Sequence, residues 1–303
     1  MRLLLFKQER KSHYFMAAPK ILIQLDTDAL PSSFDSIVAA DAGVDHLLRY
    51  DSITPENVVP ILHGAMFTRG GEGLKNTAIF IGGSDVAAGE ALLRVTQETF
   101  FGPVRVSVML DSGGCNTTAT AAVLAASSHL SLAGANALVL AATGPVGTRV
   151  CRLLAGQGAR VLAGSRREQR AAEICHRIRK SMPDAKVSPT QIDSLEKLQK
   201  IIKEIDVVIS AGSEGVQLLP ASIRESSRDL RVVIDLNAVP PLGVEGIEVQ
   251  DRGVQYGDAI CYGAIGVGGT KMKIHKAAIQ SLFQTNDLCL DAEAIFQRAQ
   301  SEI

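Results

Sequence analysis

The strongest constraint on the fold is a strand–turn–helix–strand unit between Asn136 and Arg167. Its first segment, 136–143, is almost continuously apolar, as expected for a parallel strand buried on both faces of a sheet. A short turn, a helix expected from Val146 to Gln157 and a second apolar strand over 159–165 follow it. This βαβ unit predicts a parallel sheet that binds a dinucleotide at its strand ends.

The turn after the first strand matches the dinucleotide fingerprint GxGxxG at its second and third glycines, and it reads Ala142-Thr143-Gly144-Pro145-Val146-Gly147. Gly144 allows a pyrophosphate to approach the backbone, and Gly147 allows the helix to pack closely on the strand. The helix N-terminus offers free N–H groups and a partial positive charge to the anion. Because Ala142 replaces the first glycine, we expect a slightly altered turn. The surrounding βαβ unit nevertheless favours cofactor binding over a bare turn.

The end of the second strand predicts which dinucleotide binds. An NAD enzyme usually has an acidic residue there for the ribose 2′-hydroxyl, but here the first acid is Glu168, after Ser165, Arg166 and Arg167. Guanidinium groups pair bidentately with phosphate, so the sequence favours NADP over the alternative of merely solvated arginines. The predicted cofactor-binding residues are Thr143, Gly144, Pro145, Val146, Gly147, Ser165, Arg166, Arg167, Ser210, Ala211, Gly212 and Asn237.

The remainder of the chain predicts a second α/β unit. Apolar strands at 20–25, 46–50, 77–83 and 104–110 alternate with helical patterns, and 303 residues suit two hydrophobic cores better than one. Two helices are expected at the end of the chain, Gly269 to Phe283 and Asp291 to Ser301, with Asp291 as an N-cap. We therefore expect two α/β domains with the active site in the cleft between them: residues 19–130 plus 272–303, and a Rossmann-type doubly wound sheet over 131–271. Residues 1–18 are expected to be an N-terminal extension, in which Met16 is an alternative start.

Composition excludes several classes of function. The formal net charge is −1, Trp is absent and 4% of residues are aromatic, so neither nucleic acid nor an anionic membrane is an expected partner. No segment approaches the roughly 18 apolar residues that a membrane span needs. Five widely spaced cysteines without a CxxC pair argue against zinc and a disulfide framework, so we expect no metal and a reducing cytoplasm.

Several blocks together carry a resemblance to a known family: LDTDALPSSFD (25–35), FTRGG (67–71), TAIFIGGSDVAAGE (77–90), FFGPVRVSVMLDS (100–112), NTTA (116–119), ATGPVGTR (142–149), NAVPPLGVEGI (237–247) and GAIGVGGTKMKIHKA (263–277). From about Lys20 to the C-terminus the chain resembles the NADP-dependent methylene-tetrahydromethanopterin dehydrogenases of C1-metabolising bacteria. The resemblance implies hydride transfer from methylene-tetrahydromethanopterin to NADP in a homo-oligomer, a trimer or a hexamer. Two residues depart from the family pattern: Ala142 stands where glycine is usual, and Gly114 where asparagine is usual.

The implied reaction removes a hydride from a carbon between two nitrogens, so no proton need move at that carbon and no general base is required. Positive charge develops on the substrate, which makes carboxylates at strand ends candidates for its stabilisation. Asp26 and Asp28 are the candidate catalytic carboxylates, with turn or cap residues as the alternative. The resemblance places the active-site lysine at Lys271, expected at the start of a helix, with the same face shared by His275. The candidate substrate-binding residues are Asp111, Ser112, Asn116, Thr117 and His275.

Other functions remain open at this point. A methylene-tetrahydrofolate dehydrogenase is one alternative, because the resemblance implies that some relatives also accept that carrier. A shikimate-type enzyme is another, but it would need a lysine beside Asp26 or Asp28 that we do not find. A nonenzymatic NADP(H) sensor is favoured by the departures at Ala142 and Gly114, and disfavoured by the retained DTD, DSGGCN and GGTKMK segments. Thr68 and Arg69 are candidates for contact with the substrate or with a neighbouring subunit.

Overall fold

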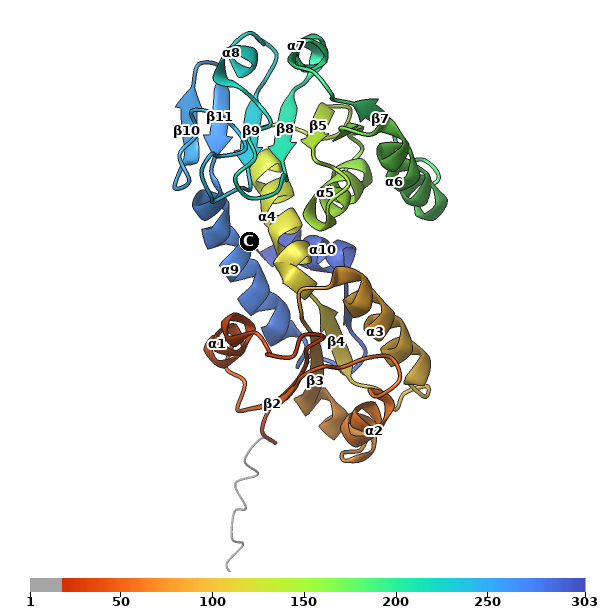
Figure 1. The fold of residues 1–303 in the computed structure, drawn as a ribbon. Coiled ribbons are helices and arrows are strands. Elements are labelled where there is room, and N and C mark those ends of the chain that lie inside the picture. The colour runs from red at the N-terminus through yellow and green to blue at the C-terminus, as the bar shows by residue number, and fades with distance from the viewer. Residues whose placement is uncertain (1–17, 303) are drawn as a thin grey trace, which may run out of the picture.

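The structure is a computed structural model that describes residues 18–302. The extension predicted over residues 1–18 lies outside the described residues, apart from Ala18. Figure 1 shows two β-sheets at opposite ends of the molecule with α4, α9 and α10 between them. The predicted α/β class is confirmed: there are two sheets covered by helices, and the second is Rossmann-type.

The first sheet is parallel throughout and has the strand order β12-β4-β3-β1-β2. From β1 the chain adds β2 on one side and then crosses to add β3 on the other, so the strand order reverses between β1 and β3. Ligands of open parallel sheets bind outside the carboxyl ends of the strands at such a reversal. The strands are β1 (Ile21–Leu25), β2 (His46–Tyr50), β3 (Thr77–Ile81), β4 (Ser107–Leu110) and β12 (Cys289–Leu290).

Helices cover both faces of this first sheet. Side chains of α2 and α3 share one apolar cluster with the strands, while α1, α4 and α9 contribute to a cluster on the other face. The strands are therefore buried on both sides, which explains their near-continuous apolar sequence. The helices are α1 (Ser33–Asp41), α2 (Val59–Phe67) and α3 (Val86–Thr99).

The second sheet has seven strands in the order β10-β11-β9-β8-β5-β6-β7. All neighbours are parallel except β10, which pairs antiparallel with β11, and the strand order reverses between β5 and β8. The strands are β5 (Asn136–Leu140), β6 (Arg160–Ser165), β7 (Val187–Gln191), β8 (Val207–Ser210), β9 (Val232–Asp235), β10 (Arg252–Tyr256) and β11 (Ala259–Tyr262). Its helices are α5 (Pro145–Gly156), α6 (Glu168–Ser181), α7 (Leu195–Ile201) and α8 (Ala221–Arg224).

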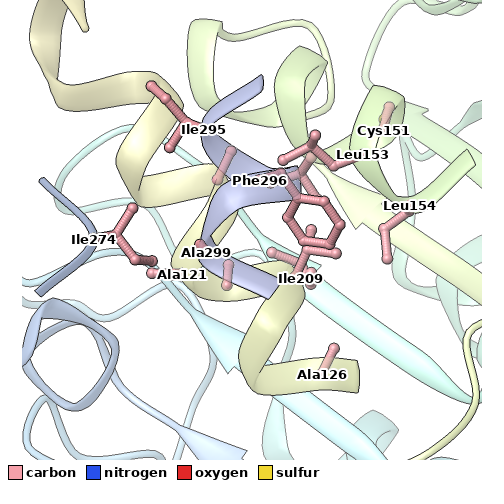
Figure 2. Close-up of a cluster of buried hydrophobic side chains, with 14 of the residues drawn as sticks. Ala121, Ala126, Cys151, Leu153, Leu154, Ile209, Ile274, Ile295, Phe296 and Ala299 are labelled. Atoms are coloured by element: carbon pink, nitrogen blue, oxygen red, sulfur yellow. The ribbon is translucent and has the colours of Figure 1, made fainter. Parts of the chain in front are cut away.

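One apolar core runs from sheet to sheet through α4 (Cys115–Ser127), α9 (Ala264–Ser281) and α10 (Ala292–Glu302). In Figure 2, Ala121 and Ala126 of α4 lie in one cluster with Phe296 of α10 and Leu153 of α5. Because α4 presents mostly alanine and threonine side chains, its neighbours pack close to its axis. The two sheets are therefore held by one shared core. How this core divides into the predicted domains stays a prediction.

The last long helix differs from its prediction. A helix was expected from Gly269, but α9 begins at Ala264 and contains the glycine-rich stretch. Two of these glycines allow close contact with the chain before β10: a Cβ on Gly263 would lie 2.0 Å from the Glu248 carbonyl oxygen, and one on Gly266 would lie 1.8 Å from that of Asp251. These glycines allow close packing at the start of a helix and do not form a loop. Lys271 therefore lies in the middle of α9.

The second C-terminal helix agrees with its prediction, because Asp291 caps α10 by accepting a hydrogen bond from the Ala294 N–H at 2.9 Å. Within residues 18–302, no helix combines the length and the apolar character that a membrane crossing requires.

Candidate active site

The predicted pyrophosphate turn joins β5 to α5. A Cβ on Gly147 would lie 2.6 Å from the Ala141 carbonyl oxygen and 2.8 Å from the Ala142 Cα, so only glycine fits there. At Gly144 an added Cβ would make only ordinary contacts, with the Ala141 carbonyl oxygen nearest at 3.6 Å. The left-handed residue of the turn is Ala141, with φ of 55°, whereas Ala142 is buried and keeps a negative φ. The altered turn expected from Ala142 is therefore centred one residue earlier.

The start of α5 fits an anion. Gly144 is the N-cap and makes no side-chain cap hydrogen bond, and Pro145 occupies the first turn. The N–H groups of this turn are therefore free of a side-chain partner and point toward the carboxyl edge of the sheet. This geometry fits the pyrophosphate of a dinucleotide.

The predicted 2′-phosphate residues lie at the carboxyl end of β6, next to β5 in the sheet. The Ser165 Oγ accepts a hydrogen bond from the Arg167 backbone N–H at 3.2 Å, and this bond shapes the turn into α6. Both guanidinium groups, of Arg166 and Arg167, are exposed, and neither forms an ion pair within residues 18–302. They are free to pair with a phosphate, and their contact with one stays a prediction.

The other predicted cofactor residues follow β8 and β9. Ser210 ends β8 in a buried position beside β5, and Ala211 and Gly212 continue the chain at the same edge. Asn237 is used locally, because its Oδ1 accepts from the Val239 N–H at 2.9 Å and its Nδ2 donates to the Pro241 carbonyl at 3.2 Å. These contacts favour a structural role for the Asn237 side chain.

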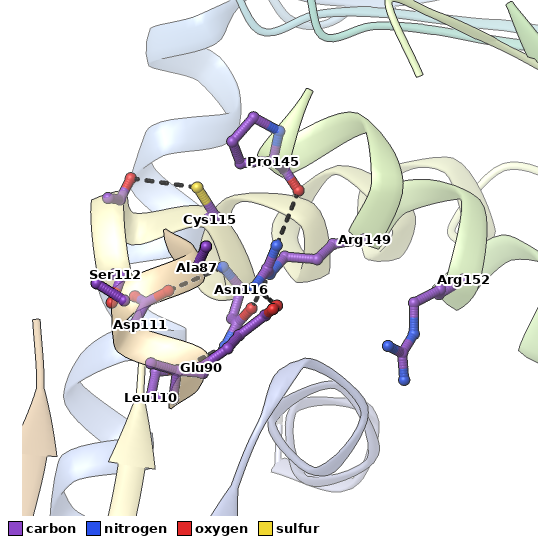
Figure 3. A network of polar contacts seen from close by, with 12 residues as sticks. Ala87, Glu90, Leu110, Asp111, Ser112, Cys115, Asn116, Pro145, Arg149 and Arg152 are labelled. Atoms are coloured by element: carbon purple, nitrogen blue, oxygen red, sulfur yellow. Dashed lines mark hydrogen bonds and ion pairs between the residues drawn. The ribbon is translucent and has the colours of Figure 1, made fainter. Parts of the chain in front are cut away.

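Arg149 of α5 brings the carboxyl edges of the two sheets together (Figure 3). Its buried guanidinium donates to Asn116 Oδ1 at the start of α4, to Glu90 Oε1 in α3 at 2.9 Å and to the Pro145 carbonyl at 3.1 Å. Helices α3 and α4 begin at the ends of β3 and β4, and α5 begins at the end of β5. The two edges that bind ligands in such sheets therefore face one another. Glu90 and Arg149 each end a block that carries the family resemblance, but neither was predicted to be a site residue.

Four predicted substrate residues hold the start of α4. The Asp111 carboxylate accepts from the Asn116 N–H at 2.8 Å, from the Thr117 N–H at 3.1 Å and from the Thr117 Oγ1 at 2.6 Å. The Ser112 hydroxyl donates to the Gly82 carbonyl at 2.9 Å, and all four side chains are buried. These contacts favour the capping alternative for Asp111, and direct contact with substrate stays a prediction.

The two candidate catalytic carboxylates hold the loop after β1. Asp26 is fully buried and accepts from the Asp28 N–H at 3.0 Å and the Ser32 N–H at 2.9 Å. Asp28 accepts from the N–H and the hydroxyl of Ser84, both at 2.9 Å. Both carboxylates lie at the reversal of strand order between β1 and β3, but each is already hydrogen-bonded within the protein. A catalytic role for either stays a prediction.

Lys271 and His275 lie on one face of α9, above the first sheet, as predicted from their spacing. The Lys271 Nζ is 5.2 Å from the centre of the Phe34 ring, and the His275 ring stacks on Phe80 with 5.5 Å between centres. Gly114, a departure from the family pattern, has φ of 62°, and a Cβ there would lie 2.5 Å from Lys271 Nζ. The departure therefore makes room for the lysine.

His275 is fully buried, and neither ring nitrogen has a hydrogen-bond partner in the described chain. Burial lowers the pKa of His275, with a smaller contribution from the Lys271 charge, while Asp111 acts in the opposite direction. The imidazole is therefore neutral at neutral pH and has unused hydrogen-bonding capacity.

Asp35 is a site residue for which no role was predicted, although it ends the block LDTDALPSSFD. Its Oδ1 is 4.0 Å from His275 Nε2, and its carboxyl lies over Gly82 at the end of β3, where an added Cβ would be 3.5 Å from Oδ2. Burial raises the pKa of Asp35 to about 6, against the effect of a hydrogen bond with Ser32. In local sequence Asp35 is an ordinary acid in the first turn of a helix, so nothing there separated it from the other residues of its block.

Two other features lie away from this site. Arg69 donates to the Pro19 carbonyl at 3.0 Å and to the Asn76 carbonyl at 2.7 Å, and thereby fixes the segment before β3. A hollow of about 690 Å³ lies at the opposite edge of the second sheet, next to Arg160 and Val187, where β6 and β7 begin. Because parallel sheets bind ligands at their carboxyl ends, we do not assign it to the active site.

Comparisons with known proteins identify two family models and a solved structure of the same fold. The family model for the N-terminal part of methylene-tetrahydromethanopterin dehydrogenase matches residues 33–113, and that for shikimate/quinate 5-dehydrogenase matches residues 123–249. Shikimate 5-dehydrogenase of Listeria monocytogenes, solved with shikimate and NAD, shares the fold with a TM-score of 0.54 at 15% identity over 92% of this chain and 96% of that one.

Two relatives from Methylorubrum extorquens align along most of the sequence. The NAD(P)-dependent methylenetetrahydromethanopterin dehydrogenase is 29% identical over 88% of this chain and 93% of its own length. The bifunctional protein MdtA is 42% identical over 92% of this chain and 98% of its own length. With this identity over nearly the whole chain, and with the N-terminal family model, the protein belongs to the methylene-tetrahydromethanopterin dehydrogenase family.

Proposed function

We propose that the protein is an NADP-dependent dehydrogenase that oxidises methylene-tetrahydromethanopterin to the methenyl form in one-carbon oxidation. The observation that carries this proposal is the contact of Arg149 with Glu90 and Asn116. Through it, the turn that fits a dinucleotide faces the polar cluster around Lys271 and Asp35. The relative named NAD(P)-dependent methylenetetrahydromethanopterin dehydrogenase supports the substrate.

The chain's own residues align the reactants and set the charge around them. NADP, when bound, accepts the hydride, and no proton is transferred at the reacting carbon, so the absence of a general base is no objection. Asp26, Asp111 and Lys271 all act on Asp35 through their charges, so the cluster of these four residues is net negative in formal charge. A negative environment stabilises the positive charge that develops on the oxidised carbon. Lys271 serves to bind and orient the pterin.

The cofactor, the assembly and the location follow from separate features. Arg166 and Arg167 support NADP over NAD. Exposed apolar side chains on α1 and β2, among them Ile37 at 64% and Leu48 at 43%, support a homo-oligomer, for which we propose a trimer or a hexamer. All five cysteines are free, which supports a reducing cytoplasm.

The first prediction tests the function itself. Purified protein given methylene-tetrahydromethanopterin should reduce NADP, followed by the absorbance of NADPH, and should do so far better than NAD. A parallel assay with methylene-tetrahydrofolate separates the pterin enzyme from the folate enzyme. If neither carrier is oxidised while NADP still binds, the enzyme proposal fails and the sensor alternative gains.

The second prediction concerns cofactor choice. The double variant Arg166→Ser/Arg167→Ser should raise the KM for NADP by about tenfold or more, because it removes charge-assisted hydrogen bonds to the 2′-phosphate. The KM for NAD should stay unchanged, since NAD lacks that phosphate. Arg170→Ser, an exposed arginine in the following helix, is the matched control. Equal losses with both cofactors would argue against 2′-phosphate recognition.

The third prediction concerns Lys271. Lys271→Ala should raise the KM for the pterin or lower kcat by about tenfold or more, because a charged contact is lost, while NADP affinity is retained. Lys273→Ala is the control, because that side chain is exposed on another face of α9. A Lys271→Ala enzyme with wild-type kinetics would contradict the assigned role.

The fourth prediction concerns Gly268, which lies on the face of α9 that carries Lys271 and His275. A Cβ there would meet nothing within 4 Å, so the bare backbone leaves room between the two sheets. Gly268→Ala should raise the stability of the helix by about 0.5–1 kcal/mol and yet lower kcat/KM, because the methyl group intrudes on the bound rings. Thermal unfolding and kinetics measure the two effects.

Gly269 is the control for this fourth prediction. It also has nothing within 4 Å, but it is exposed on another face of α9. Gly269→Ala should therefore stabilise the helix to a similar extent without loss of activity. If both variants keep full activity, the space at Gly268 has no part in binding.

A further inference from the structure

The first sheet reverses its strand order between β1 and β3, and α1 places one carboxyl group over that point. Asp35 Oδ2 would lie 3.5 Å from a Cβ on Gly82, the residue after β3, and Asp26, the residue after β1, acts on Asp35 through its charge. This reversal is where a parallel sheet of this order binds its ligand. Asp35 therefore lies where a substrate bound at the edge of the first sheet is expected.

Asp35 differs from Asp26, Asp28 and Asp111 in how its oxygens are used. Asp26, Asp28 and Asp111 each accept hydrogen bonds from backbone N–H groups, and these bonds hold loops or the start of α4. No backbone N–H group in residues 18–302 donates to the Asp35 carboxylate; its nearest polar neighbours are the Ser32 hydroxyl and the ring of His275, at 4.0 Å. It is the carboxylate of this cluster whose hydrogen-bonding capacity is left for a ligand.

The charges around Asp35 come from three other elements. Asp26 at the end of β1 and Asp111 at the end of β4 disfavour its ionisation, whereas Lys271 of α9 favours it. His275 of the same helix is neutral because burial lowers its pKa. With its own pKa at about 6, Asp35 is ionised at neutral pH without a cation in direct contact. A ligand that brings N–H donors would satisfy this carboxylate.

A pterin presents such donors. Its pyrimidinone ring carries a ring N–H beside an exocyclic amino group, and the two point in the same direction, so they match the two oxygens of one carboxylate. Phe34 precedes Asp35 in α1 and is 47% exposed, which leaves a flat apolar surface beside the carboxylate. The pair thus offers both a hydrogen-bonding edge and a stacking face for a bicyclic ring.

We propose that the Asp35 carboxylate binds the N–H edge of the substrate's pyrimidinone ring and thereby fixes the pterin over α1. This inference rests on the proposed function and adds the residue that recognises the carrier. Lys271, whose Nζ is 5.2 Å from the centre of the Phe34 ring, then lies within reach of the same ring system. The contact is common to tetrahydromethanopterin and tetrahydrofolate, because both carry the same pyrimidinone edge.

The experiment measures equilibrium binding of tetrahydromethanopterin, and of tetrahydrofolate in parallel, to the full-length protein without NADP. Asp35→Asn keeps the size of the side chain but replaces one acceptor by a donor, so binding should weaken by about tenfold or more. Asp35→Glu keeps the carboxylate and should retain part of the affinity. Asp41→Asn, an exposed acid at the end of the same helix, is the matched control and should bind as the wild type does.

The pH dependence gives an independent readout. Wild-type affinity for the pterin should fall as the pH drops through about 6, where Asp35 takes up a proton, and this acid limb should be absent in Asp35→Asn and present in Asp35→Glu. The folded pKa of about 6 exceeds the ordinary 3.8, so ionisation of Asp35 destabilises the fold as pH rises through that window. Asp35→Asn should consequently raise Tm at neutral pH.

The possible outcomes separate this inference from the proposed function. A wild type that binds the pterin, together with an Asp35→Asn variant that binds it equally well and keeps the acid limb, overturns the role of Asp35. A wild type that binds no reduced pterin at all overturns the proposed function together with this inference. Weaker binding of Asp35→Asn with a raised Tm and unchanged NADP affinity supports the role, because damage to the fold would lower Tm.

Discussion

The hydrogen bonds from the start of α4 to the Asp111 carboxylate are the interaction on which the rest of the structure depends. They anchor to β4 of the first sheet a helix whose remaining length is packed in the core that the two sheets share. The small alanine side chains of α4 allow α5, α9 and α10 to pack closely against it, so the two sheets share one core. A rigid helix with a fixed first turn thus sets the distance between the two carboxyl edges.

Arg149 connects the expected pyrophosphate site of the second sheet to residues beside the first sheet. Its guanidinium lies one turn after Pro145 at the expected pyrophosphate site, and it ends on Asn116 and Glu90 beside the first sheet. Hydride transfer requires two rings to meet in one geometry, and that alignment is the main contribution of a protein that supplies no general base. A buried arginine with three partners holds such an alignment better than an exposed ion pair, which is worth little in water.

The sequence predicted well what depends on neighbouring residues. The βαβ unit, the strand alternation and the shared face of Lys271 and His275 follow from periodicity and turn residues, and all were found. The start of α9 was missed because Gly263 and Gly266 pack against backbone that lies twelve or more residues earlier in the chain, a contact that the local sequence does not show. Asp35 and Arg149 lie in blocks that carry the resemblance, but their roles were not predicted, because those roles depend on long-range partners and locally each is an ordinary helix residue. The roles of the predicted aspartates could not be separated without seeing which oxygens were already bonded.

Two side chains of the polar cluster above the first sheet, Asp35 and His275, have pKa values that burial shifts in opposite directions. Burial raises the pKa of Asp35 and lowers that of His275, so each group is held in surroundings that oppose its charged form. Neither group is needed to cap a helix or to pair a strand, unlike Asp26, Asp28 and Asp111. Destabilising groups persist where function requires them, and perturbed pKa values gather at such places. Asp26, Asp28 and Asp111 thus hold the local structure at this edge of the sheet. The Asp35 carboxylate keeps hydrogen-bonding capacity, so it is the acid that we expect to recognise the substrate.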